Sequence, residues 1–186
     1  MTFPLGKAHN PLRVESEGDY QLSDVEIHST GRTMTVQINR PEKKNALTTD
    51  MYRDLTFAIN KFESDQYYRT FAIFGDSEAF TAGNDINDFI AHEENDLPEY
   101  IATFLNALTQ AQKPLLAGVS GLAIGIGVTM LLHCDLVYAA SDATFQLPFL
   151  KLGLVPEAGS SLILPQLIGH RKACELLFFG EAFDAE

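Results

Sequence analysis

The stretch PLLAGVSGLAIGIGVTMLLHCDLVYA, residues 114–139, holds the most informative pattern of the chain. Residues 114–119 form a short apolar run that is typical of a buried strand. Gly125 and Gly127 then allow a sharp turn into a helix near 127–133, and 136–139 reads as a second strand. The uncharged part, 115–134, is as long as a membrane span. Its four glycines and the polar Ser120, Thr129 and His133 favour a buried strand, a turn and a buried helix instead.

The flanking sequence continues this alternation of strands and helices. Upstream, residues 25–29 and 34–38 predict a hairpin around Gly31, and 70–74 predicts a buried strand. Helices are expected from an N-cap at Thr48 or Thr49 to about residue 65, with an apolar stripe of Met51, Leu55, Ile59 and Phe62, and over 98–110. Downstream, 145–147 reads as a short extended piece, and 160–167 and 171–179 read as helices. The pattern predicts an α/β layered fold in one domain over residues 23–186, after a polar lead-in over 1–22.

Composition excludes several classes of protein. The chain has 186 residues, 46% of them apolar and 20% charged, so it is long and apolar enough for a sizeable core. Its net charge of −12 argues against a nucleic-acid partner, which requires a basic face. Two cysteines are too few for a disulfide framework and favour free thiols in a reducing compartment. The sequence has no His/Cys cluster at metal-ligand spacing and no nucleophile elbow or phosphate-binding loop.

Three segments remain as places for chemistry. The glycine turns at 82–84 and 125–127 each follow a strand, and each can leave backbone N–H groups free. Two such donors from separate turns can form an oxyanion hole, although a pair of glycine turns is more often only a feature of the topology. Glu157 is expected in the first turn of an otherwise apolar helix. It either acts as a proton-transfer group or simply stabilises the helix dipole. The helix N-terminus lowers the pKa of such a carboxyl and apolar neighbours raise it, so its protonation state stays open.

Four motifs in order resemble the enoyl-CoA hydratase/isomerase (crotonase) superfamily. They are N-R-P-x-x-x-N-A-L from Asn39, F-x-A-G-N-D-I from Phe80, G-x-A-x-G-x-G from Gly121 with Cys134-Asp135 behind it, and P-F-x-x-L-G-x-x-P-E-A-G-S-S from Pro148. The combination is most similar to delta-3,delta-2-enoyl-CoA isomerases of the peroxisomal type. The resemblance implies a crotonase-like spiral of repeated β-β-α units and an acyl-CoA substrate, with no cofactor beyond the coenzyme A that belongs to the substrate.

The resemblance also assigns residues. The N–H groups of Ala82 and Ile126 match the oxyanion-hole donors, and Glu157 matches the single catalytic carboxylate of the isomerases. Substrate contacts are implied for the residues around these motifs: Arg40, Lys43, Lys44, Ala46, Gly83, Asn84, Asp85, Ile86, Gly125, Phe149 and Leu152. For Lys43 and Lys44 a solvated basic turn is an equal alternative, and for Phe149 and Leu152 core packing is the simpler explanation.

Two departures from the hydratases of this family favour isomerisation. Thr129 and Phe149 stand at the positions where the hydratases carry the two glutamates that activate water. Glu157 is left as one proton shuttle, which suits movement of a double bond from the 3 to the 2 position during β-oxidation of unsaturated fatty acids. The alternatives are a hydratase or other crotonase-type enzyme, and a non-catalytic acyl-CoA-binding scaffold.

Family members usually continue into a further helical segment that covers the acyl-CoA site and helps to form trimers. We expect this segment to be missing or truncated here, and a homo-oligomer, trimer or hexamer, for the full-length protein. A cytoplasmic location is expected if the protein is bacterial, and a peroxisomal or mitochondrial one if it is eukaryotic. No nucleic-acid or membrane partner is expected.

Overall fold

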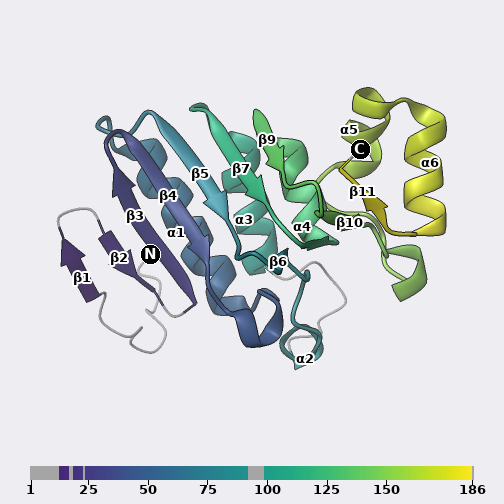
Figure 1. Cartoon of the computed structure of the whole chain (residues 1–186), viewed down its shortest axis with the longest axis horizontal. Helices are drawn as coiled ribbons and strands as arrows, with labels where there is room; N and C mark the ends of the chain where they lie inside the picture. The colour runs from purple at the N-terminus through teal and green to yellow at the C-terminus, as the bar shows by residue number, and fades with distance from the viewer. Residues whose placement is uncertain (1–12, 17–18, 23, 92–98, 186) are drawn as a thin grey trace, which may run out of the picture.

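Two β-sheets and the helices that cover them organise the chain (Figure 1). A computed structural model describes residues 13–16, 19–22, 24–91 and 99–185. The larger sheet contains, in spatial order, β1 (Arg13–Ser16), β2 (Asp19–Gln21), β3 (Val25–Thr30), β4 (Thr33–Ile38), β5 (Thr70–Phe74), β7 (Leu115–Val119) and β9 (Leu136–Ala139). The smaller sheet contains β11 (Phe183–Asp184), β10 (Thr144–Gln146), β8 (Leu122–Ile124) and β6 (Ala79–Thr81).

The helices connect these strands. They are α1 (Thr49–Ser64), α2 (Ile86–Ala91), α3 (Glu99–Gln110), α4 (Ile126–Thr129), α5 (Ser160–Ile168) and α6 (His170–Phe179), with short 3-10 helices η1 (Pro41–Lys43), η2 (Met130–His133) and η3 (Leu150–Leu152). Strands β1 to β4 are antiparallel, whereas β4, β5, β7 and β9 run parallel, because helical crossovers separate them. This arrangement confirms the expected α/β layers.

The predicted elements appear with small shifts in their limits. The hairpin 25–38, the strands at 70–74, 114–119 and 136–139, and the helices after residues 48, 98, 159 and 169 are all present. Thr48 is the N-cap of α1, and its side-chain oxygen accepts a hydrogen bond from the Met51 N–H at 3.3 Å. The start of the structure was predicted too late, since β1 and β2 extend the sheet into the expected lead-in. The remainder of that lead-in, residues 1–12 and 17–18, lies outside the described residues.

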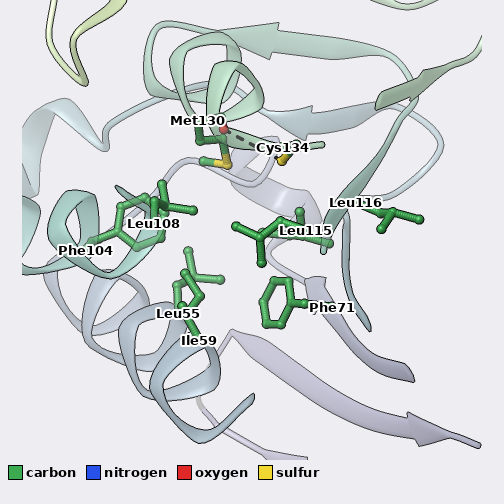
Figure 2. A pocket seen from close by; sticks show the side chains of 10 residues that line it. Leu55, Ile59, Phe71, Phe104, Leu108, Leu115, Leu116, Met130 and Cys134 are labelled. Atoms are coloured by element: carbon green, nitrogen blue, oxygen red, sulfur yellow. Dashed lines mark hydrogen bonds between the residues drawn. The ribbon is translucent and has the colours of Figure 1, made fainter. Parts of the chain in front are cut away.

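The hydrophobic core lies between the larger sheet and the pair α1 and α3, which cover one of its faces (Figure 1). The predicted stripe Met51, Leu55, Ile59 and Phe62 is buried in it. A void of about 10 Å³ lies where α1, α3, β5, β7 and η2 meet. Figure 2 shows the side chains that line it, among them Leu55, Phe104 and Met130. A void of this size has room for about one water molecule and offers it no polar side chains, so it is a packing defect and not a substrate pocket.

Both cysteines are free thiols, as predicted. Cys134 borders the void and its S–H points to the Met130 carbonyl at 3.7 Å (Figure 2). Burial raises the pKa of this thiol to about 12, so it stays protonated and unreactive. Within the described part of the chain, no helix is long and apolar enough to cross a membrane. The uncharged stretch 115–134 forms β7, β8, α4 and η2 instead.

Candidate functional site

The two glycine turns identified in the sequence lie against each other. Strands β6 and β8 pair in parallel, with Thr81 opposite Ala123, so the turns that follow them meet at one edge of the smaller sheet. A Cβ atom on Gly83 would lie 3.0 Å from the Ile124 carbonyl oxygen, and one on Gly127 would lie 2.7 Å from Thr81 Cγ2. The close approach of the two turns therefore requires glycine at both positions.

Ala82 does not provide the free amide that the resemblance assigned to it. Its N–H donates to the Lys44 carbonyl oxygen at 2.9 Å, so the prediction of an oxyanion donor at Ala82 is wrong. The cause is the loop that precedes α1, in which Lys44 and Asn45 adopt left-handed conformations with φ of 50° and 58°. This conformation turns the Lys44 carbonyl toward the end of β6, a contact between segments far apart in the sequence.

Two other amides remain available at the junction of the turns. Among the hydrogen bonds of the described residues, none uses the N–H of Asn84 or of Ile126. Asn84 lies between two bonds to Leu47, since Leu47 N–H donates to the Gly83 carbonyl and Asp85 N–H donates to the Leu47 carbonyl. Its own N–H therefore points away from Leu47. Ile126 is the first residue of α4, where backbone N–H groups have no partner within the helix.

Glu157 follows η3 and precedes α5 by three residues. It was expected in the first turn of the helix, but α5 begins only at Ser160, after Gly159 with φ of 65°. Ser160 donates its N–H and its hydroxyl to the Glu157 carbonyl oxygen at 3.0 and 2.7 Å. The His133 ring donates from Nε2 to the Ala158 carbonyl at 2.8 Å. These bonds hold Ala158 in a left-handed conformation, φ of 54°, and fix the backbone that carries Glu157.

The side chain of Glu157 is largely removed from water. Its Oε1 accepts a hydrogen bond from the Thr129 hydroxyl at 2.7 Å, whereas Oε2 is buried and has no partner among the described residues. Burial raises the pKa of Glu157 to about 7, and the Thr129 hydrogen bond opposes part of this shift. The conflict left open by the sequence is thus decided by burial, because the carboxyl lies outside the helix.

Tyr52 on α1 connects Glu157 with the first turn. Its hydroxyl donates to the side-chain oxygen Oδ1 of Asn84, the residue whose backbone N–H takes part in no hydrogen bond of the described residues. Burial, and after it the negative charge of Glu157, raises the pKa of Tyr52 well above its usual range. Electrostatic coupling of this kind requires the two groups to be close. The structure therefore brings Asn84, Glu157 and Thr129 together around the N-terminal half of α1.

Arg40 and Asp85 form an internal pair rather than open contacts. Arg40 Nη1 lies 2.8 Å from Asp85 Oδ2 and 3.0 Å from the Ala46 carbonyl. The Arg40 guanidinium holds the pKa of Asp85 below its usual range. The Arg40 guanidinium, which was expected to contact coenzyme A, thus forms hydrogen bonds within the protein. The pair connects the loop before α1 with the residue that precedes α2.

The other predicted contact residues are distributed between surface and core. Lys43, Lys44 and Ile86 are exposed, Ala46 is half-buried, and neither lysine forms an ion pair within the described residues. Gly125 has φ of 58° and donates its N–H to the Gln146 carbonyl, which sets the sharp entry into α4. Phe149 is buried in the hydrophobic core, as the simpler explanation had it, whereas Leu152 is exposed on η3.

Sequence reasoning missed Tyr52 and His133 as residues of this site. The motif spacing identified the turn at 82–84 but assigned the donor to Ala82 instead of Asn84. Thr129 was considered only as the residue that replaces a hydratase glutamate. Tyr52 gives no signal of its own, because it lies on a helix among core residues. Only the packing of α1 on the two turns reveals its hydrogen bond to Asn84.

Several known proteins are similar to this chain in sequence and fold. Residues 29–186 match the protein family described as enoyl-CoA hydratase/isomerase. The chain is 37% identical over 165 residues to enoyl-CoA delta isomerase 2 of Rattus norvegicus, covering 86% of this chain and 42% of that protein. It is 34% identical over 172 residues to enoyl-CoA delta isomerase 3, peroxisomal, of Mus musculus, covering 89% and 54%. The chain thus spans about half the length of these curated relatives.

A solved structure shows the same architecture. The enoyl-CoA hydratase/isomerase from Pseudoalteromonas atlantica superimposes with a TM-score of 0.83 at 40% sequence identity, covering 88% of this chain and 65% of that one. The predicted crotonase-like fold is therefore confirmed, over about two thirds of the length of that solved structure.

Proposed function

Because this chain belongs to the enoyl-CoA hydratase/isomerase family, we propose that it moves a carbon–carbon double bond from the 3 to the 2 position of an acyl-CoA. One observation carries the proposal. The carboxyl of Glu157 is buried and its Oε2 has no partner among the described residues, and at the same site the backbone N–H groups of Asn84 and Ile126 take part in no hydrogen bond of those residues. Thr129 and Phe149 are not acids, so the site lacks a second carboxyl at the positions where the hydratases have their glutamates.

The proposed reaction needs only one proton-transfer group. The carboxylate of Glu157 removes a proton from C2 of a 3-enoyl thioester, and the C2–H electron pair delocalises into a dienolate. Negative charge then develops on the thioester oxygen, where the N–H groups of Asn84 and Ile126 donate to it. The protonated Glu157 returns the same proton to C4, which yields the conjugated 2-enoyl thioester.

The pKa of Glu157 suits both halves of this cycle. At about 7, it is close to the pH at which the group has to work, so the base and its conjugate acid are both accessible. Loss of one oxyanion donor in comparable sites costs about 3–4 kcal/mol of transition-state stabilisation. We therefore assign the larger electrostatic contribution to the Asn84 and Ile126 amides and the proton transfer to Glu157.

The remaining predicted contacts are part of the proposal. Lys43 and Lys44 are exposed cations on the loop whose backbone holds β6, and they are proposed to approach the phosphates of coenzyme A, with Ala46 beside its adenine. A homo-oligomer, a trimer or hexamer, is proposed from the apolar surface between residues 136 and 179. A role in β-oxidation of unsaturated chains, and a peroxisomal or mitochondrial compartment in a eukaryote, stay predictions.

The test offers the purified protein 3-hexenoyl-CoA and crotonyl-CoA in separate assays. We expect isomerisation of the first to be the faster reaction and Glu157→Gln to lower its kcat at least about 100-fold, as loss of a positioned base does. Glu175→Gln on α6 is the matched control, because its carboxylate is exposed and pairs with Lys172 at the surface. Faster hydration of crotonyl-CoA, or full isomerase activity in Glu157→Gln, would refute the assignment. Binding of coenzyme A without turnover of either substrate would favour the non-catalytic scaffold.

A further inference from the structure

Among the described residues, Thr129 makes the only hydrogen bond to the Glu157 carboxyl. Its side chain is fully buried on α4, and its hydroxyl donates to Oε1 at 2.7 Å. The other oxygen near this hydroxyl, the Ile126 carbonyl, lies at 3.5 Å, at the limit of a hydrogen bond. Glu157 Oε1 is therefore the acceptor that decides where the hydroxyl proton points.

The two oxygens of the carboxyl are thereby made unequal. Oε1 is occupied, and Oε2 is buried without a partner in the part of the chain that the structure describes. A buried carboxylate oxygen without a donor is unfavourable, and such exceptions call for an explanation. An oxygen that must take up and release a proton has to be free of competing donors.

We infer that Thr129 is a positioning residue, which holds Oε1 so that Oε2 alone takes the proton from C2 of the substrate and returns it to C4. The inference rests on the proposed function. In the first step the C2–H bond breaks and an Oε2–H bond forms. In the second the Oε2–H bond breaks and a C4–H bond forms, so Glu157 ends as it began.

The Thr129 hydrogen bond is compatible with both states of the cycle. A carboxylate accepts it at Oε1, and a carboxyl protonated on Oε2 still has a carbonyl-like Oε1 that accepts it. The threonine hydroxyl thus remains a donor throughout and prevents rotation of the carboxyl between the two proton transfers. A glutamate at this position would add a second acid and base, whereas threonine adds a fixed donor.

The groups that face Glu157 from neighbouring elements supply no substitute for this donor. Tyr52 from α1 directs its hydroxyl to Asn84, and His133 from η2 donates to the Ala158 carbonyl. Both act on the surroundings of the carboxyl, and neither hydrogen-bonds to it. Removal of the Thr129 hydroxyl should therefore leave the carboxyl with no fixed orientation.

The test compares Thr129→Val, which keeps the shape of the side chain, with Thr129→Ser, which keeps the hydroxyl. The pKa of Glu157 is followed by carboxyl ¹³C NMR on the chain without substrate. Since the hydroxyl stabilises the charged form, we expect the pKa to rise by about one unit in Thr129→Val and to stay near the wild-type value in Thr129→Ser. In the isomerase assay, kcat should fall about tenfold or more in Thr129→Val, with KM within about twofold, and recover in Thr129→Ser.

The possible failures are distinguishable. An unchanged pKa and kcat in Thr129→Val, with Glu157→Gln inactive, would overturn this inference and leave the proposed function intact. Full activity in Glu157→Gln would overturn both. If Thr129→Val unfolds, Thr129→Ala provides the same comparison without the added methyl group, and equal pKa values in the Ala and Ser variants would refute the role of the hydroxyl.

Discussion

At the scale of single residues, Glu157 shows how the fold alters an ordinary side chain. The carboxyl would be charged in an unfolded chain at neutral pH, but burial raises its pKa from 4.5 to about 7 in the folded state. Between these values the folded chain binds more protons at this group than the unfolded chain does. The contribution of this proton binding to the free energy of unfolding is therefore fully present below pH 4.5. It is lost as the pH rises through 7.

This proton linkage predicts the stability of Glu157→Gln. Between pH 4.5 and pH 7, protonation of Glu157 changes the free energy of unfolding by about 3 kcal/mol. The glutamine side chain does not titrate, so the variant lacks this change. Relative to the wild type, the variant should gain stability on going from pH 4 to pH 8, although its activity is lost. Urea unfolding of both proteins at the two pH values measures the difference. A stability difference that does not change with pH would show that Glu157 titrates normally.

The backbone N–H groups of Ala82 and Asn84 show the limit of motif spacing at the same scale. The F-x-A-G-N-D-I motif locates the turn after β6, but the direction of each amide depends on distant partners. The Lys44 carbonyl accepts a hydrogen bond from the Ala82 N–H. Leu47 forms hydrogen bonds with the peptide groups on both sides of Asn84. No pattern within the motif distinguishes these two positions two residues apart.

At the scale of elements, long periodic segments were predictable, whereas several of the shortest strands were not. The stripe from Met51 to Phe62 identifies α1 because its spacing repeats over about three turns. Strands β6, β8 and β11 have two or three residues each and show no period of their own. They exist because β10 and β8 offer edges to pair with, so the smaller sheet is a product of tertiary contacts.

The junction of β6 and β8 supplies a prediction about glycine. A Cβ on Gly121 would lie 1.9 Å from the Glu78 carbonyl oxygen, whereas one on Gly31 would meet nothing within 4 Å. Both have φ close to +60°, so the backbone strain of an alanine is the same at each. We expect Gly31→Ala to cost about 1 kcal/mol and Gly121→Ala more than about 3 kcal/mol, because only the latter must separate β6 from β8. Chemical denaturation of the two variants tests this, and equal losses would contradict it.

At the scale of the whole molecule, apolar surface is concentrated in the last third of the chain. Most of the exposed large apolar side chains of the described residues lie between 136 and 179, on β9, η3, the segment before Glu157, α5 and α6. In Figure 1, α5 and α6 form one end of the molecule, and β9 is the edge strand of the larger sheet on that side. Surfaces of this kind mark contacts with other chains in soluble proteins.

Self-association through this surface is the corresponding prediction. Sedimentation velocity over a concentration series should show oligomers of the wild type, and Phe178→Ser with Phe179→Ser on α6 should weaken association by about tenfold or more. Tyr67→Ser is the control, since Tyr67 is also an exposed aromatic residue but lies beyond the end of α1. A wild type that stays monomeric throughout the series would argue against this interface. So would an effect of Tyr67→Ser as large as that of the double phenylalanine variant.

The amino-acid sequence by itself determined the order of the main strands and helices, the two glycine turns and the lone acid at 157, because these are properties of neighbouring residues. The tertiary structure decided which amide faces the site, that Glu157 is a group with a pKa of about 7, and that Thr129 occupies one of its oxygens. Those properties depend on burial and on hydrogen bonds between segments far apart in the chain, which only the folded arrangement brings within reach.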